Sequence, residues 1–164
     1  MTHFNAEAVE AIKALRARYF RAMDTGDHEL FRSCLTEDLV TDLKGGNYHF
    51  AFDNREDFVN AVADALNAQS APRHYGHMPE ITLTGPDTAE GIWYFQDWVL
   101  DLPTNMVIDG SGIIHDHYRK DDGQWRICRY SYRRVVETIY PWHNGAQLTV
   151  HRLGETGRQP KAQS

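Results

Sequence analysis

Two short segments far apart in this chain contain the residue types of a general acid–base site. Tyr19-Phe20-Arg21-Ala22-Met23-Asp24 ends an amphipathic helical pattern with a carboxylate, and Arg73-His74-Tyr75-Gly76-His77 opens a strand-like segment with an imidazole. A carboxylate that accepts a hydrogen bond from an imidazole fixes its tautomer, and the other ring nitrogen can then take a proton from a substrate. Asp24 and His74 are therefore the candidate catalytic pair. The plain alternative for Asp24 is an exposed carboxylate, although the helix dipole disfavours negative charge at this end of a helix.

The second segment places its two histidines on opposite faces of a strand. Side chains alternate between the two faces of a strand, so that one of His74 and His77 faces the core. An inward histidine is also commonly a hydrogen-bonded core residue. The predicted faces are His74, Gly76 and Met78 on one side and Tyr75, His77 and Ile81 on the other.

A further carboxylate, Asp97, falls on an otherwise apolar strand face. This costs several kcal/mol unless the carboxylate is paired or hydrogen-bonded. Arg134, beside two tyrosines on the last predicted strand, is a candidate partner or a group that stabilises an oxyanion. A salt bridge with no catalytic part is an equally good interpretation. The shared faces are Trp93, Phe95, Asp97 and Val99 on one strand and Tyr130, Tyr132, Arg134 and Val136 on the other.

The chain shows no motif for a metal or a cofactor. His115-Asp116-His117 places two imidazoles on one side of a strand, but no third ligand follows at a diagnostic spacing, and we expect a solvated face and no metal. Gly110-Ser111-Gly112 is typical of a turn or bulge rather than of a phosphate loop. Cys34 and Cys128 form no CxxC pair, which favours a reducing compartment.

Composition excludes several classes of partner. The 164 residues carry a formal net charge of −6 and no lysine- or arginine-rich block, which argues against nucleic acid or an anionic membrane as a partner. No apolar run approaches the roughly 20 residues that cross a bilayer, and no signal peptide is visible. We therefore expect a cytoplasmic protein.

Hydrophobic periodicity predicts helices first and long strands afterwards. Asn5 is a candidate N-cap, and so is Asp53 or Asn54. The predicted helices are Ala6–Met23, His28–Cys34 and Arg55–Gln69, and the predicted strands are Leu39–Leu43, Tyr48–Phe52, His74–Thr84, Thr88–Leu100, Met106–Lys120 and Gln124–Thr138.

This order predicts an α+β fold, in which a strongly curved, mostly antiparallel sheet wraps the N-terminal helices as a cone around an apolar pocket. We expect one domain over residues 1–157 and a disordered tail over 158–164.

At these residues the chain resembles SnoaL-like proteins of the nuclear-transport-factor-2-like superfamily, whose fold is a cystatin-like α+β barrel. The resemblance runs from about Ala8 to Glu137. It is carried by Ala11–Leu15 leading into Tyr19–Asp24, by His74–Thr82, by Gly91–Tyr94 with Asp97, and by Asp116–Tyr118 leading to Asp122–Ile127.

Within the superfamily the pattern is most similar to bile-acid 7α-dehydratase, with scytalone dehydratase and hexachlorocyclohexane dehydrochlorinase as further relatives. The resemblance implies the catalytic set Tyr19, Asp24, His74, Asp97 and Arg134, no cofactor, and a homo-oligomer, either a trimer or a dimer. A second histidine and tyrosine of scytalone dehydratase have no clear counterpart here, and His115 or Tyr48 is the candidate. The segment after Thr138 is a candidate lid.

The expected activity is that of a cofactor-independent lyase, a dehydratase that acts on a small apolar cyclic substrate such as a steroid, polyketide or aromatic-degradation intermediate. His74 removes a proton next to a carbonyl, Tyr19 or Asp97 polarises the carbonyl or protonates the leaving hydroxyl, and Arg134 binds a substrate carboxylate or holds Asp97. The alternatives are an isomerase that uses the same pair and a non-catalytic binding or assembly module, like the β-subunits of ring-hydroxylating dioxygenases. The expected substrate contacts are Phe20, Trp93, Phe95, Tyr130, Tyr132 and His115.

Overall fold

The computed structural model describes residues 5–143 and 145–160. Its elements follow the predicted order of helices before long strands, and the fold is α+β, as expected. In chain order they are α1 (Ala6–Thr25), α2 (His28–Ser33), β1 (Leu35–Lys44), β2 (His49–Phe52), α3 (Arg55–Ala65), β3 (Ser70–Leu83), β4 (Thr88–Asp101), β5 (Met106–Asp121), β6 (Gln124–Pro141) and α4 (Arg152–Thr156).

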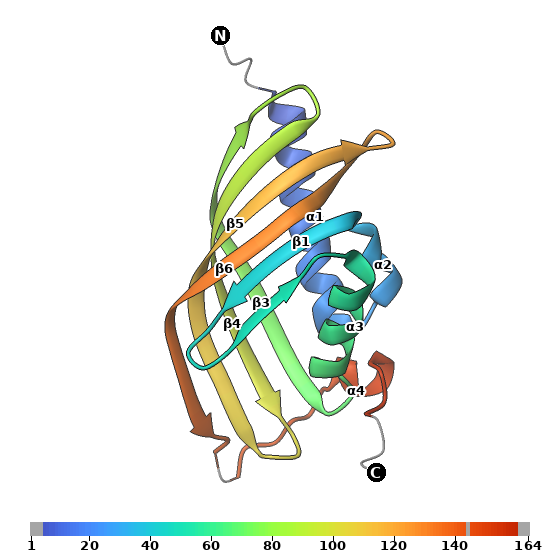
Figure 1. Ribbon diagram of the computed structural model, residues 1–164. Coiled ribbons are helices and arrows are strands. Elements are labelled where there is room, and N and C mark those ends of the chain that lie inside the picture. The colour runs from blue at the N-terminus through green and yellow to red at the C-terminus, as the bar shows by residue number, and fades with distance from the viewer. Residues whose placement is uncertain (1–4, 144, 161–164) are drawn as a thin grey trace.

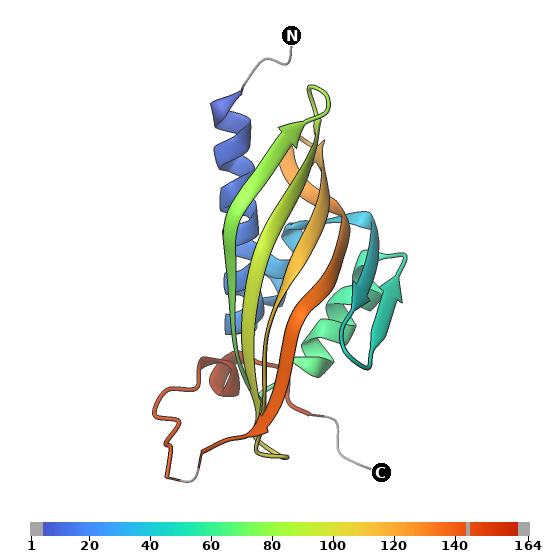
Figure 2. The same ribbon diagram turned by 90° about the vertical axis from the view of Figure 1, so that its left-hand side faces the viewer.

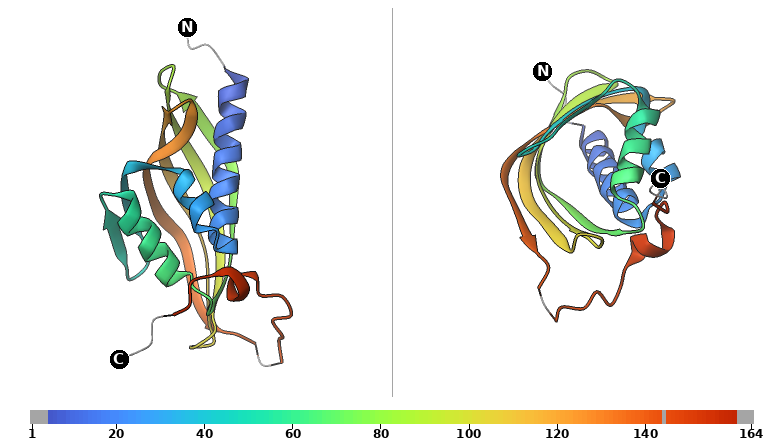
Figure 3. Two further views of the ribbon diagram at one scale, coloured as in Figure 1. Left: turned by 90° about the vertical axis from the view of Figure 1, so that its right-hand side faces the viewer. Right: turned by 60° about the horizontal axis from the view of Figure 1, so that its bottom comes forward.

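The six strands form one sheet in the order β2-β1-β6-β5-β4-β3. All neighbours are antiparallel except β1 and β6, which run parallel. The sheet bends around α1, which lies inside the curve (Figures 1 and 3). A sheet with one apolar face must bury that face, and here α1 fills the hollow that the curvature creates.

Helix α1 begins at the predicted residue, Ala6, and ends two residues after the predicted Met23, at Thr25. The Asn5 side chain accepts a hydrogen bond from the amide of Ala8 at 3.1 Å, and Gly26 ends the helix with φ +67°, a conformation that glycine adopts without strain. The inward stripe is almost fully buried and comprises Ala8, Ile12, Leu15, Arg16, Tyr19, Phe20 and Ala22. This face supplies the core, and its last turn carries Asp24.

Helix α3 begins at the predicted cap, because the Asn54 side chain accepts a hydrogen bond from the amide of Asp57 at 2.8 Å. It ends at Ala65 rather than at Gln69, so that the next strand starts earlier than predicted, at Ser70. Helix α3 covers the end of the hollow that α1 leaves open, next to β1 and β2 (Figure 3).

Two β-bulges change which side chains face inward. In β3 the register shifts between His77 and Glu80, and Met78 has φ +44° and a side chain that is 77% exposed. The prediction that Met78 shares the inner face with His74 is therefore wrong, and Ile81 packs against the core instead of facing outward. A second bulge opposite Ser111 and Gly112 leaves Val136 exposed, against the prediction that it faces inward with Arg134.

The C-terminal segment turns back along the sheet and ends in α4, a helix that the sequence pattern did not predict (Figure 2). Leu153 is buried against the end of α1, and the Thr156 hydroxyl donates to the carbonyl of Thr25. Arg158 forms an ion pair with Asp64, so the start of the predicted disordered tail is anchored. Residues 161–164 of that tail lie outside the described residues. Among residues 5–143 and 145–160, no helix combines the length and apolar character needed to cross a membrane.

Candidate active site

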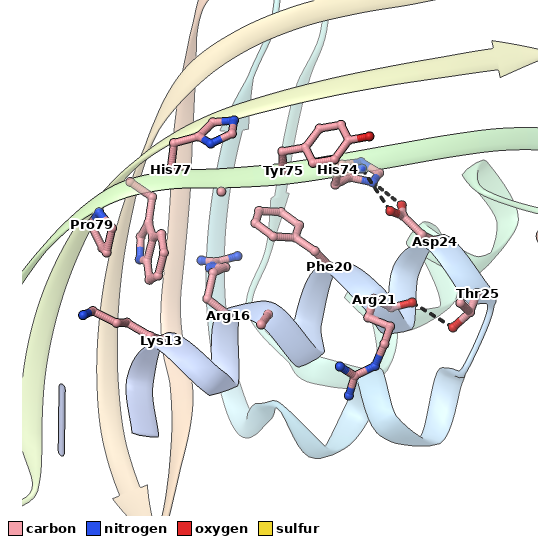
Figure 4. Close-up of a pocket in the computed structure, with 13 residues that line it drawn as sticks. Lys13, Arg16, Phe20, Arg21, Asp24, Thr25, His74, Tyr75, His77 and Pro79 are labelled. Carbon is pink, nitrogen blue, oxygen red and sulfur yellow. Dashed lines mark hydrogen bonds and ion pairs between the residues drawn. The ribbon is translucent and has the colours of Figure 1, made fainter. Parts of the chain in front are cut away.

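The last turn of α1 and the edge strand β3 bring Asp24 and His74 together. Nδ1 of His74 lies 2.6 Å from Oδ1 of Asp24, and the backbone amide of His74 donates to Oδ2 of the same carboxylate at 3.0 Å (Figure 4). The ionised carboxylate is an acceptor only, so Nδ1 is the donor, and in the neutral imidazole Nε2 keeps its lone pair. Asp24 thus fixes both the backbone and the ring of His74.

The ring of His74 is held but not enclosed. Its side chain is 8% exposed, while that of Asp24 is 24% exposed. The Phe20 ring stacks parallel to the imidazole, with centroids 5.9 Å apart. Among the described residues, Nε2 has no hydrogen-bond partner, and this atom is therefore free to take a proton from a bound molecule.

His74 borders two hollows. One is an open groove of about 680 Å³ between α1 and β3, where Tyr75 and His77 lie on the side of the strand away from the helix (Figure 4). The other is an apolar cavity of about 320 Å³ inside the cone. The cavity is the better place for chemistry, because two other predicted catalytic residues, Tyr19 and Asp97, also line it. Its lining includes Tyr19, Phe20, Met23, Leu43, Phe50, Phe52, Phe58, Val62, Leu66, His74, Phe95, Asp97, Val99, Tyr130 and Tyr132.

Asp97 is the direct neighbour of His74 across β3 and β4, where the two residues form a register pair. The carboxylate receives two parallel hydrogen bonds from Arg134, at 2.5 and 2.8 Å, and both side chains are at least nine-tenths buried. Burial by itself lowers the pKa of Arg134, but the bonds to Asp97 outweigh it and the pKa is raised, so that the arginine stays charged. The pairing that the sequence suggested for Asp97 is thus present in the structure.

Arg134 reaches Asp97 by crossing β5 at Gly110. A Cβ at Gly110 would lie 2.8 Å from Nη1 of Arg134 and 2.8 Å from the carbonyl oxygen of Val136. Gly110 is therefore needed because Arg134 passes close to its backbone. The bulge that the sequence also suggested lies at the next two residues, Ser111 and Gly112.

Arg134 has further partners, so its positive charge is already paired within the protein. Its Nε donates to the Tyr48 hydroxyl at 3.2 Å and lies 3.0 Å from Oε2 of Glu137. The Tyr48 hydroxyl in turn is 2.7 Å from that of Tyr132, which lines the cavity. Tyr48 therefore joins the site through Arg134 and Tyr132, and Glu137 is a site residue that the sequence did not reveal.

Three tyrosines give the cavity hydroxyl groups that keep their protons. Burial raises the pKa of Tyr19, Tyr130 and Tyr132, so each is a neutral phenol near pH 7. For Tyr19 the nearby Arg16 works against this burial and lowers the pKa in part. Such hydroxyls can donate hydrogen bonds to a carbonyl or hydroxyl oxygen of a bound molecule.

A buried ion pair joins α1 to β5, and the sequence did not predict it. Arg16 on α1 pairs with Asp116 on β5, and both side chains are almost completely buried. Asp116 also accepts a hydrogen bond from the Tyr118 hydroxyl at 2.6 Å, which itself accepts one from the Trp93 indole at 2.8 Å. Asp116 alternates with Ile114 and Tyr118, so the signal that identified Asp97 was present here as well.

Two predicted substrate contacts lie elsewhere. His115 is exposed on the outer face of the sheet, because it alternates with the buried Ile114 and Asp116. Trp93 is buried and borders the groove between α1 and β3 rather than the cavity. Phe20, Phe95, Tyr130 and Tyr132 do line the cavity. His115 and His117 are both exposed, and the part of the chain that the structure describes contains no group of three residues arranged to hold a metal ion.

Comparison with known proteins agrees with this geometry. The sequence matches the family described as SnoaL-like domain over residues 5–131. The chain belongs to the SnoaL-like family. Its helices, cone-shaped sheet and interior cavity are thus those of an NTF2-like protein with a cystatin-like fold.

Solved structures with this fold include three similar ones. The hexachlorocyclohexane dehydrochlorinase LinA type 2 has a TM-score of 0.73 at 15% identity, covering 88% of this chain and 96% of that one. A candidate aromatic ring hydroxylase from Novosphingobium aromaticivorans has a TM-score of 0.74 at 22% identity, covering 84% and 94%. A candidate scytalone dehydratase from the same organism has a TM-score of 0.74 at 16% identity, covering 100% and 99%. At these identities the likeness shows the fold alone.

Proposed function

We propose that this protein is a cofactor-independent lyase, a dehydratase in which His74 is the base. The observation that carries the proposal is the Asp24–His74 hydrogen bond of 2.6 Å beside a cavity that also contains Asp97, Tyr19 and Tyr132. The SnoaL-like family and the fold shared with LinA and a candidate scytalone dehydratase support the same class of reaction.

The proposed reaction removes water from a cyclic β-hydroxy ketone. Nε2 of His74 takes the proton from the carbon next to the carbonyl, and Asp24 stabilises the imidazolium that forms. The electron pair of that C–H bond becomes the new double bond, and the C–O bond to the hydroxyl breaks. Tyr19 gives the departing hydroxyl its proton, so that water leaves, and the proton on His74 later restores Tyr19 through solvent.

The charge on the cavity wall favours a neutral substrate. Arg134 contacts the carboxylates of both Asp97 and Glu137. Its positive charge is therefore already paired and is not available to a carboxylate on the substrate. This supports its role in holding Asp97, rather than the alternative of binding a substrate carboxylate. A negatively charged ligand in the cavity would instead meet the carboxylate of Asp97 in an apolar surrounding, which is unfavourable.

The size of the cavity favours small rings. Its volume of about 320 Å³ lies at the lower end of the range of ligand pockets, roughly 300–1,000 Å³. Among the ring systems considered above, a one- or two-ring polyketide or aromatic-degradation intermediate fits this volume better than a four-ring steroid.

The experiment is a screen of neutral cyclic β-hydroxy ketones and their carboxylated analogues in D₂O. NMR reports deuterium exchange next to the carbonyl, and ultraviolet absorbance reports the conjugated product. We expect exchange and elimination with a neutral compound for the wild type, and a loss of about 10²–10⁴ in rate for H74A. H77A, on the same strand but the opposite face, is the matched control and should keep the wild-type rate.

The outcomes separate the alternatives. Exchange followed by migration of a double bond, without loss of water, would identify an isomerase that uses the same pair. Turnover by H74A at the wild-type rate would contradict the proposal.

A further inference from the structure

Arg16 and Asp116 form a buried ion pair whose presence is not explained by its contribution to protein stability. The side chain of Arg16 is 1% exposed and that of Asp116 is fully buried. Burying both charges removes them from water, and well-packed apolar side chains in their place are often as stable or more stable. The pair lies next to the cavity, so its effect on the site is the natural question.

Arg16 is poorly supplied with hydrogen-bond acceptors. One Nη atom bonds to Asp116, whereas Nε and the other Nη are buried and have no hydrogen-bond partner within residues 5–143 and 145–160. The guanidinium carbon lies over aromatic rings instead: Cζ is 4.5 Å from the ring centroid of Tyr19 and 5.0 Å from that of Tyr130. The positive charge is therefore directed at the two tyrosines that line the inner end of the cavity.

A chain of hydrogen bonds fixes the position of Arg16. Asp116 holds the guanidinium, the Tyr118 hydroxyl donates to Asp116 at 2.6 Å, and the Trp93 indole donates to that hydroxyl at 2.8 Å. This chain of contacts runs from α1 through β5 to β4. A charge held in this way does not have to reorganise when the charge of a neighbour changes.

We propose that Arg16 is a positioning residue for Tyr19, whose guanidinium stabilises the negative charge that develops on the Tyr19 oxygen as this tyrosine gives its proton to the leaving group. The inference rests on the proposed role of Tyr19, but the electrostatic coupling between Arg16 and Tyr19 exists whether or not that role is correct. Asp116 has the opposite effect on Tyr19, since its charge disfavours a phenolate nearby, and its part is to keep Arg16 in place.

The test measures the acidity of Tyr19 without any substrate. A fluorinated tyrosine, which is more acidic than tyrosine, is incorporated at position 19, and ¹⁹F NMR follows its titration in the full-length protein. We expect R16M to make the phenol less acidic by about tenfold, which is one pKa unit. We expect D116N, which leaves the charge of Arg16 uncompensated, to make it more acidic. The same label at Tyr132, which is not a neighbour of Arg16, should titrate unchanged in both variants.

The opposite signs separate the proposal from a structural role. A merely loosened core would admit water and make the phenol more acidic in both variants, and would shift the label at Tyr132 as well. That result, or an unchanged titration in R16M, would overturn the proposal. If R16M does not fold, a shift in D116N confined to the Tyr19 label supports the proposal, and a shift shared with the Tyr132 label contradicts it. Failure of the dehydratase screen would not alter either result.

Discussion

Two side-chain pairs, Asp24–His74 and Asp97–Arg134, meet where His74 on β3 lies beside Asp97 on β4, and they differ in which of their atoms have no partner. Asp24 and His74 share one ring hydrogen bond, and Nε2 of the histidine has no partner among the described residues. Asp97 and Arg134 share two hydrogen bonds, and Arg134 also contacts Glu137 and the Tyr48 hydroxyl. The first pair has an atom available for chemistry, while the second is saturated and fixes the wall beside it. The carboxylate of the first pair is also the more exposed one, so both the number of partners and the exposure distinguish the proposed catalytic pair from the supporting one.

The largest expected effect comes from breaking the first pair. D24N replaces an acceptor with an amide that can donate to Nδ1, which turns the imidazole to the other tautomer and removes the lone pair from Nε2. We expect a loss of about 10²–10⁴ in rate, measured as deuterium exchange on a substrate found in the screen. Stability should change little, because Asp24 is partly exposed. D27N, at the exposed cap of α2, is the control.

Breaking the second pair should affect stability more than any other change considered. R134M leaves the carboxylate of Asp97 buried without its partner, and we expect the free energy of unfolding to fall by about 3 kcal/mol in urea denaturation. The double variant D97N/R134M removes both charges and should recover part of this loss. If the double variant is as unstable as the sum of the two single variants, the two residues do not act as a pair.

A smaller loss of stability is expected at Gly110, where the Arg134 side chain crosses β5. In G110A the added methyl group meets Arg134 and the backbone oxygen of Val136, and we expect a loss of about 1–3 kcal/mol. S111A, at the next residue, should lie within about 0.5 kcal/mol of the wild type. Equal stability of G110A and the wild type would show that Arg134 has another path to Asp97.

The smallest effect comes from an ion pair of the same chemistry that is open to water. Asp38 receives two hydrogen bonds from Arg119, which lower its pKa to about 2, although the carboxylate is 64% exposed. Because the pKa is lower in the folded protein, this pair contributes stability above about pH 4, and the contribution is lost as the pH falls toward 2. We expect only about 0.5 kcal/mol, given solvent screening. Comparing urea unfolding of D38N and wild type at pH 6 and pH 2.5 checks this. A difference that does not shrink on acidification would contradict the assignment.

Much of the fold was accessible from local patterns. Caps such as Asn5 and Asn54 act within one helical turn, and long alternating strands leave few arrangements other than a curved sheet around α1. The bulge at Met78 was not accessible, because one extra residue changes the facing of every side chain after it without a marker in the sequence. Helix α4 is too short for a periodic pattern, and it is held by tertiary contacts such as that of Leu153.

The sequence predicted those site residues that interrupt a regular pattern, such as a carboxylate on an apolar strand face. Asp97 was identified because a carboxylate fell on an apolar strand face. Asp116 carries the same signal but was interpreted as part of a polar run with His115 and His117, and Arg16 was not recognised on the inner face of α1. His115 was placed in the site by resemblance, whereas strand alternation puts it on the outside.

The account depends most directly on the state of the His74 ring. Long-range ¹⁵N–¹H NMR of the imidazoles, recorded at a pH where the ring is neutral, distinguishes a protonated from an unprotonated ring nitrogen. For the wild type we predict a proton on Nδ1 of His74 and a bare Nε2, and for D24N the reverse. A proton on Nε2 in the wild type, or the same tautomer in both proteins, would contradict the claim that Asp24 makes His74 a base aimed into the cavity.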